Sequence, residues 1–206
     1  MNEKFLELTE EKQMRIIDAA MEVFGTNEYK HAVTDEIARK AGISKGLLFY
    51  YFKNKKSLYQ YVYQYCLQLL VDTIDEAGVK NKTDFFEIMR FGADKKMELI
   101  ANHAYIMEFC MKAYYMNDEN IAEKITQDIQ QKVNTMFTDY FSHIDLFKFK
   151  EGIDPFYIFQ MLQWMADGYI RTKQKTKEKL DINEIMEDYD RWEEMFKQMV
   201  YRKEYL

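Results

Sequence analysis

The chain has 206 residues, a net charge of −6, one proline and seven glycines. A chain of this length can bury an ample core, and so few turn-forming residues predict an all-α fold of long helices. No secretory signal sequence is visible, no apolar run approaches the length of a membrane span, and the two cysteines, Cys66 and Cys110, fit reduced core thiols. These features predict a cytoplasmic protein without a membrane partner.

Two short helices joined by a tight turn are predicted near the amino end, followed at once by a third, longer helix. Thr34 is placed to cap the first helix, and Gly42 to end it in the left-handed conformation that glycine favours. Ser44 is placed to cap the second helix, whose core pair is Leu48 and Phe52. This layout is typical of a helix-turn-helix, whose second helix enters the major groove of DNA.

The charges of the same segment favour DNA binding. Residues 37–71 contain no Asp or Glu. The basic residues in that range are Arg39, Lys40, Lys45, Lys53, Lys55 and Lys56. Residues 1–60 hold ten basic and nine acidic residues (+1), whereas the remainder holds 19 and 26 (−7). A local basic patch, rather than the global balance, is the signature of a nucleic-acid binder, although a solvated helix face would look the same.

A long helix is predicted at residues 55–77, with one apolar stripe. The stripe consists of Leu58, Val62, Tyr65, Leu69 and Thr73 or Ile74. We expect this helix to link a DNA-binding domain, residues 1–54, to a second helical domain, residues 55–206. A tilt at its far end would then displace the DNA-reading helix.

Five further helices are predicted, at residues 83–101, 103–116, 118–142, 155–175 and 182–204, with the longest loop at 143–154. Asp154 as cap and Pro155 at the first position favour a helix start. The helix at 155–175 is apolar on nearly every face and that at 182–204 has a narrow apolar seam, so the pair fits half of a four-helix interface with a second copy. Packing within one chain is the alternative. The predicted interface residues are Phe156, Phe159, Leu162, Ile185, Tyr189, Trp192, Phe196 and Met199.

Aromatic and methionine side chains crowd the C-terminal part of the chain. Such residues can line a cavity for a hydrophobic or aromatic ligand, although at helical spacing they also fill an ordinary core. The candidates for ligand binding are Phe85, Met89, Phe109, Tyr114, Tyr140, Phe141, Trp164, Met165 and Tyr169, with Phe86, Tyr115 and Met116 beside them.

The sequence does not favour an enzyme or a metal site. His31, His103 and His143 lie far apart, and none forms a pair with metal-ligand spacing. No phosphate-binding glycine loop, nucleophile elbow or paired-cysteine motif is found. We therefore expect neither catalysis nor a cofactor.

The run GISKGLLFYYFKNK at residues 42–55, followed by Leu58, resembles the DNA-binding signature of the TetR family of bacterial transcription regulators. Residues 16–24 are similar to the first helix of that family, so the resemblance covers residues 10–60. Three positions depart from the family pattern. Glu28 replaces a usual glycine, Val33 a capping Ser or Thr, and Phe49 a tyrosine that contacts phosphate.

The resemblance implies an N-terminal three-helix DNA-binding domain and a C-terminal domain that senses a small molecule and dimerises. It implies a ligand-responsive regulator, a repressor, that binds a palindromic operator as a homodimer and is released by a hydrophobic or aromatic effector. An all-helical adaptor, whose basic segment contacts a protein partner, is the alternative. The implied DNA-binding residues are Thr34, Ser44, Lys45, Gly46, Leu47, Phe49, Tyr50, Tyr51, Lys53, Lys55 and Lys56. Among these, Lys45, Gly46, Leu47 and Tyr50 would face the bases or the adjoining backbone, and Thr34, Tyr51 and Lys55 would hold phosphates.

Overall fold

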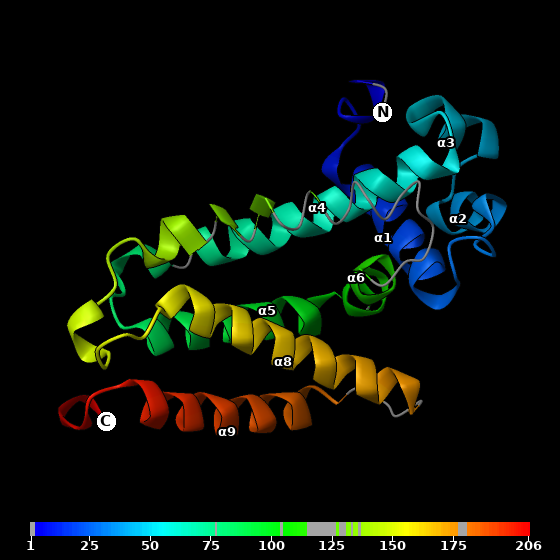
Figure 1. Ribbon diagram of the computed structural model, residues 1–206. Helices are drawn as coiled ribbons and strands as arrows, with labels where there is room; N and C mark the ends of the chain where they lie inside the picture. Colours follow the sequence, from blue (N-terminus) through cyan, green and yellow to red (C-terminus); the bar gives the residue numbers. More distant parts are fainter. Residues whose placement is uncertain are drawn as a thin grey trace. The chain divides into compact units, whose positions relative to one another are not determined.

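The structure, a computed structural model, describes residues 3–76, 78–103, 105–114, 127, 131–132, 134–135, 137–176 and 181–206. Within these residues the regular elements are helices, which confirms the predicted all-α fold (Figure 1). In addition, one isolated antiparallel β-bridge joins Phe149 and Tyr201. No helix of the described part combines the length and the hydropathy needed to cross a lipid bilayer.

The chain forms two compact units. The first contains residues 1–77 and 98–134, and the second contains residues 78–97 and 135–206. The boundary predicted at residue 54 stays a prediction.

The first unit contains the predicted helix-turn-helix. Its elements are a 3₁₀ turn η1 (Glu3–Phe5), α1 (Glu10–Thr26), α2 (Thr34–Ala41), α3 (Lys45–Phe52), α4 (Lys55–Glu76) and α6 (Ile106–Tyr114). Helix α1 packs against both α2 and α6. The core between them is aromatic: Phe24 of α1 and Phe109 of α6 lie against Tyr59 of α4, with ring centres 4.8 and 5.1 Å from it. Phe109, a candidate for the ligand cavity, is therefore a core residue of this unit, fully buried.

The turn between α2 and α3 is formed as the sequence predicts, but the start of α2 is not. Gly42 has φ of 69°, the left-handed conformation, and its N–H bonds back to α2. Val33, in an extended conformation, occupies the cap position, and no side chain caps the helix. Thr34 is already the first helical residue, so the prediction that it caps α2 is wrong.

The long helix predicted at residues 55–77 is α4, which ends at Glu76. Leu58, Val62 and Ile74 are buried, whereas Tyr65 and Leu69 are half-buried. All of α4 lies in the first unit. Its predicted role as the link between two domains stays a prediction.

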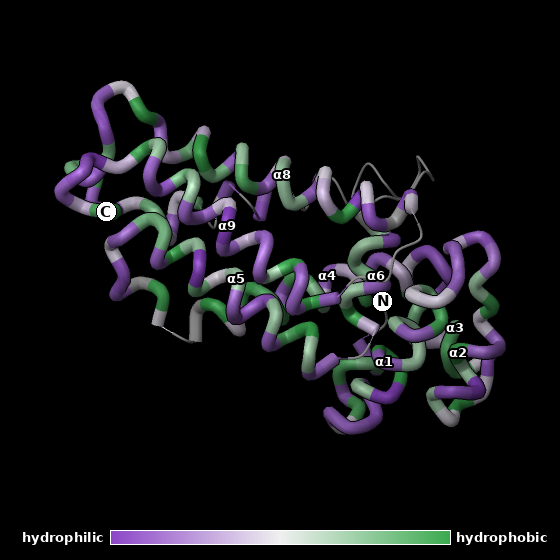
Figure 2. The backbone as a smooth tube through the Cα atoms, turned by 90° about the horizontal axis from the view of Figure 1, so that it is seen from below, coloured by the Kyte–Doolittle hydropathy of each residue, from purple (hydrophilic) through white to green (hydrophobic). Residues whose placement is uncertain are grey.

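The second unit is built from most of α5 (Phe85–Asn102) together with α8 (Pro155–Lys175) and α9 (Ile182–Val200). Three short 3₁₀ turns complete it: η2 (Val79–Asn81), η3 (Leu146–Lys148) and η4 (Lys203–Tyr205). Both α8 and α9 carry hydrophobic as well as hydrophilic residues along their length (Figure 2). The predicted helix at 118–142 falls largely outside the described residues, as do Tyr115 and Met116.

The predicted start of α8 is confirmed, whereas the predicted end of α9 is wrong. Asp154 caps α8, because its Oδ1 accepts a hydrogen bond of 2.9 Å from the N–H of Phe156. Helix α9 was predicted to run to residue 204 but ends at Val200. Tyr201 is extended there because its backbone pairs with Phe149, and its ring, fully buried, packs against that of Phe149 at 4.9 Å.

Candidate nucleic-acid interface

The second helix of the helix-turn-helix, α3, has one buried and one exposed face. Ser44 caps it as predicted, because its Oγ accepts a hydrogen bond of 3.1 Å from the N–H of Leu47. The buried face consists of Leu48, Tyr51 and Phe52. The exposed face consists of Lys45, Gly46, Leu47 and Tyr50, with Phe49 half-buried at its edge. An exposed leucine and an exposed tyrosine therefore place apolar surface on the outer side of this short helix.

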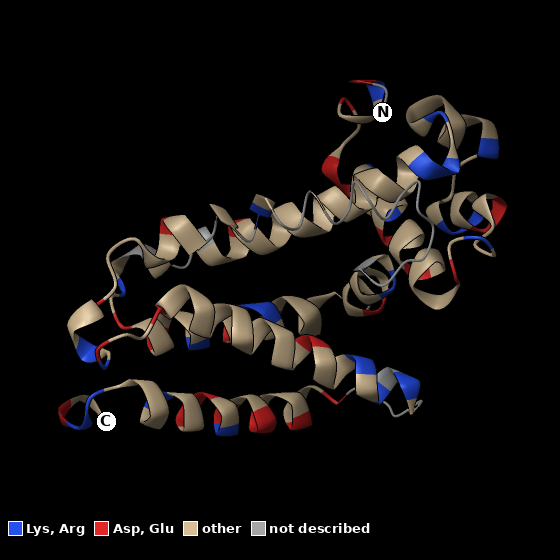
Figure 3. Cartoon of the chain, viewed as in Figure 1, with Lys and Arg blue, Asp and Glu red and all other residues tan. Residues whose placement is uncertain are grey.

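Basic residues lie beside this exposed face, and Figure 3 marks them in blue where α3 gives way to α4. Lys53 and Lys56 are both exposed. Lys53 takes the positive φ of 62° that turns the chain from α3 into α4. Asn54 caps α4, since its Oδ1 accepts a hydrogen bond of 2.8 Å from the N–H of Ser57. A capped helix amino end beside lysines is a favourable site for phosphate.

Lys45, at the start of α3, is paired with an acidic residue of α2. Its Nζ lies 2.7 Å from Oδ2 of Asp35, and both side chains are more than half exposed. This ion pair ties the two helices of the helix-turn-helix together across their exposed side. The carboxylate also partly neutralises the positive charge of Lys45, a residue that the sequence analysis predicts to contact DNA.

Lys55 has protein partners of its own. Its Nζ donates a hydrogen bond of 3.3 Å to the carbonyl oxygen of Lys30 and lies 4.7 Å from the centre of the Tyr29 ring. Burial lowers the pKa of this lysine. The side chain thus fastens the loop before α2 to the start of α4, and its predicted contact with phosphate stays a prediction.

The two tyrosines of α3 differ in exposure. Tyr50 is 53% exposed, whereas Tyr51 is 7% exposed and packs edge-on against Phe5. Their rings lie 5.7 Å apart. Tyr51 is therefore mainly a packing residue, and its predicted role at phosphate is untested.

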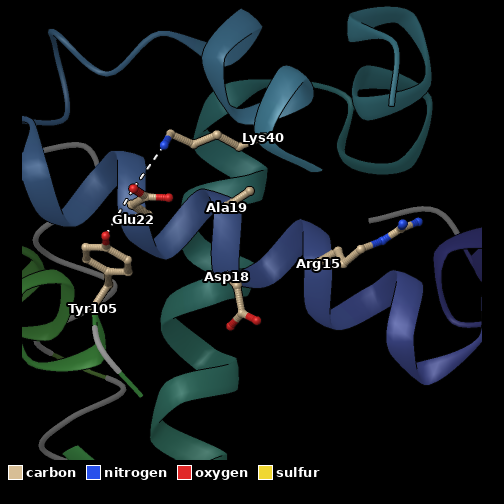
Figure 4. A pocket seen from close by; sticks show the side chains of 6 residues that line it. All are labelled: Arg15, Asp18, Ala19, Glu22, Lys40 and Tyr105. Atoms are coloured by element: carbon tan, nitrogen blue, oxygen red, sulfur yellow. Dashed lines mark hydrogen bonds and ion pairs between the residues drawn. The ribbon is translucent and has the colours of Figure 1, made fainter. Parts of the chain in front are cut away.

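Glu22 of α1 joins three segments of the first unit (Figure 4). Its Oε1 accepts hydrogen bonds from Nζ of Lys40 in α2, at 2.9 Å, and from the hydroxyl of Tyr105 just before α6, at 3.1 Å. The hydrogen bond from Lys40 holds the pKa of Glu22 below its usual value. These groups line a hollow in the surface of α1, together with Arg15, Asp18 and Ala19.

The predicted ligand-binding residues are divided between the two units. Phe109 and Tyr114 belong to the first unit and the others to the second. In the second unit Phe85, Met89, Tyr140 and Phe141 are buried, Met165 and Tyr169 are half-buried, and Trp164 is 58% exposed. Phe85 and Phe141 pack together, with ring centres 5.2 Å apart, and their role in ligand binding stays a prediction.

The predicted dimer residues lie on α8 and α9. Phe159, Leu162 and Phe196 are buried within the unit, and Met199 is 60% exposed. The others, Phe156, Ile185, Tyr189 and Trp192, are half-buried. Further exposed apolar side chains of these helices are Tyr157, Trp164 and Met195.

Sequence reasoning missed four residues of the first unit: Phe5, Glu22, Asp35 and Asn54. Asn54 had a local signal, since an asparagine directly before the first residue of a helix is a common N-cap. The other three act through partners that lie far along the chain, which no local pattern reveals.

The helix-turn-helix lies in a segment that matches a known protein family. Residues 16–62 match the tetR family of bacterial regulatory proteins. The chain is 25% identical over 171 residues to the fatty acid metabolism regulator protein of Bacillus subtilis. This alignment covers 83% of this chain and 88% of that protein.

Two solved structures of similar fold extend over most of the chain. The fatty acid degradation regulator FadR from Bacillus halodurans aligns with a TM-score of 0.72 and 20% identity over 87% of this chain and 96% of its own. FadR from Bacillus subtilis in complex with stearoyl-CoA aligns with a TM-score of 0.64 and 22% identity over 85% of this chain and 96% of its own.

Proposed function

We propose that this chain is a transcription regulator of the tetR family of bacterial regulatory proteins, a homodimeric repressor of a palindromic operator. The observation that carries the proposal is the exposed face of α3, capped by Ser44 and bordered by Lys53 and Lys56. Lysines and helix amino ends hold the DNA backbone, whereas side chains in the groove read the bases. We assign the first role to Lys53, Lys56 and the amino end of α4.

The reading side chains in this proposal are Lys45, Leu47 and Tyr50. Lys45 can donate to guanine, and Leu47 can contact the methyl group of thymine. Gly46 lies between them without a side chain and allows the helix to approach the DNA closely. Two such helices, one from each subunit, would read two half-sites whose centres lie about one helical turn, or a multiple of it, apart.

We propose that the effector is a long-chain fatty acyl-CoA and that it binds the C-terminal part of the chain. The support comes from the Bacillus subtilis regulator, whose solved structure holds stearoyl-CoA. The aromatic and methionine side chains of the C-terminal part suit an acyl chain. For release, the acyl-CoA must bind the DNA-free state more tightly than the DNA-bound state.

DNA binding is tested by fluorescence anisotropy with an operator selected from a randomised DNA pool. We expect log K to fall linearly with log salt, with a slope of about −0.9 for each phosphate neutralised. Stearoyl-CoA should then release the operator, while free coenzyme A, the matched control, should not. Binding that ignores salt and sequence alike would refute the regulator and favour the adaptor. DNA binding that stearoyl-CoA leaves unchanged would refute only the effector.

A further inference from the structure

The chain ahead of α1 is a folded segment rather than a loose end. In residues 3–8 the N–H of Leu6 bonds to the carbonyl of Glu3 at 2.9 Å, and that of Leu8 bonds to the carbonyl of Phe5 at 3.2 Å. The side-chain amide of Gln13 in α1 donates to the carbonyl oxygens of Leu6 and Leu8 at 3.3 and 2.9 Å. The segment lies outside the residues 16–62 that match the family.

Phe5 anchors this segment between α3 and α4. Its side chain is fully buried. Its ring centre lies 4.7 Å from that of Phe52 and 5.8 Å from that of Tyr51, the last two residues of α3. It also lies 5.3 Å from the ring of Tyr61 in α4. The ring of Phe5 therefore contacts both α3, the proposed recognition helix, and α4, the helix that follows it.

The position of α3 depends on such contacts, because the backbone between α3 and α4 is short. Only Lys53 and Asn54 separate the two helices, and Lys53 has a positive φ. Leu48 anchors the first half of α3 in the core. Phe5 supports the second half of α3 through its contact with the ring of Tyr51. The ring of Tyr51 in turn adjoins that of the exposed Tyr50.

We propose that Phe5 is a positioning residue for DNA recognition, which sets the orientation of α3 through Tyr51 and Phe52. The inference rests on the proposed function and deepens it. Contacts with base edges require an accurately placed helix, whereas contacts with phosphates tolerate displacement. Phe5 therefore governs the preference for the operator over other DNA more than it governs binding to DNA as such.

The test compares Phe5→Ala and Phe5→Leu with Leu6→Ala, a change at the neighbouring side chain that is 55% exposed. Binding to the selected operator and to unrelated DNA of equal length is measured by anisotropy. Circular dichroism gives the folded fraction of each variant, and affinities are expressed per folded molecule. We expect Phe5→Ala to weaken operator binding about tenfold or more and binding to unrelated DNA less than about twofold. Phe5→Leu should lie between Phe5→Ala and the wild type, and Leu6→Ala should match the wild type.

An unchanged ratio of operator to unrelated affinity in Phe5→Ala would overturn the inference, since Phe5 would then only stabilise the fold. If Phe5→Ala does not fold, the same ratio in Phe5→Leu decides: a fall supports the inference and wild-type preference overturns it. A wild-type protein that binds no DNA would instead refute the proposed function, so the two failures are distinguishable.

Discussion

Asp35 holds a position that the sequence did not connect with DNA recognition. Its carboxylate pairs with Lys45 across α2 and α3, and under the proposed function it would compete with DNA for that ammonium group. The pair is exposed, so its contribution to the free energy of unfolding is small, about 0–1 kcal/mol. Its effect on a polyanionic partner is larger, because the carboxylate also repels phosphate.

Substituting Asp35→Asn should therefore strengthen binding to any DNA while leaving the fold stable. We expect the salt slope to become steeper by about one unit, as for one added phosphate contact. The control is Glu36→Gln, which makes the same change of charge one residue away, at a carboxylate that forms no ion pair with a described residue. Titration of DNA at several salt concentrations gives both slopes. Equal slopes for the two variants would show that the ion pair does not restrain Lys45.

At the scale of elements, α1 and α6 approach each other closely at Gly25. A Cβ atom built there would lie 3.3 Å from the backbone nitrogen of Phe109 and 3.4 Å from Cβ of Glu108. Glu22, one turn earlier on α1, accepts the hydrogen bond from Tyr105. Together these contacts fix α6 against α1, which in turn packs against α2 of the helix-turn-helix.

Gly25→Leu should push α6 away from α1 and lower the free energy of unfolding by about 1–3 kcal/mol, the usual cost of overpacking. Gly92→Leu in α5 is the control, because a Cβ atom built at Gly92 would meet no atom within 4 Å and α5 carries none of the proposed interface residues. There the better helix propensity should raise the free energy of unfolding by about 0.5–1 kcal/mol. Urea unfolding measures both. A Gly25→Leu variant as stable as the wild type would show that α1 and α6 are not rigidly packed.

Elements differ in how far the sequence alone predicts them. The Gly42 turn and the caps at Ser44 and Asp154 depend on residues next to one another, and the structure confirms them. The end of α9 could not be predicted, because a partner about fifty residues earlier in the chain, Phe149, draws Tyr201 out of the helix. The site divides in the same way. The exposed face of α3 follows from helical spacing, whereas the partners of Lys45 and Lys55 and the place of Phe5 depend on packing between distant segments.

At the scale of the whole molecule, the exposed apolar side chains of α8 and α9 favour assembly. Tyr157, Trp164, Met195 and Met199 are each more than half exposed. Residues 157 and 164 are seven positions apart on α8, and residues 195 and 199 are four apart on α9, so each pair shares one helix face. We propose this exposed apolar surface as the interface between two copies of the chain.

We expect the wild type to sediment as a dimer at micromolar concentration. Trp164→Glu should shift it toward monomer, because the change places a charge in an apolar interface. Leu146→Glu, at an equally exposed leucine of η3, should leave the dimer intact. Sedimentation velocity distinguishes the species. A monomeric wild type would refute the homodimer, and a dimeric Trp164→Glu variant would place the interface elsewhere.

The contribution of α6 to the first unit restricts how regulators of this kind can exchange parts. A hybrid that joins the first 76 residues of this chain to a foreign C-terminal domain would lose Phe109, and with it the ring that packs against both Phe24 and Tyr59. The hybrid would keep every residue proposed to contact DNA and still have an incomplete core. Recombination between relatives should therefore succeed where the incoming sixth helix brings an aromatic side chain of matching size. We therefore expect α3 and α6 of this chain to be exchanged successfully only as a pair.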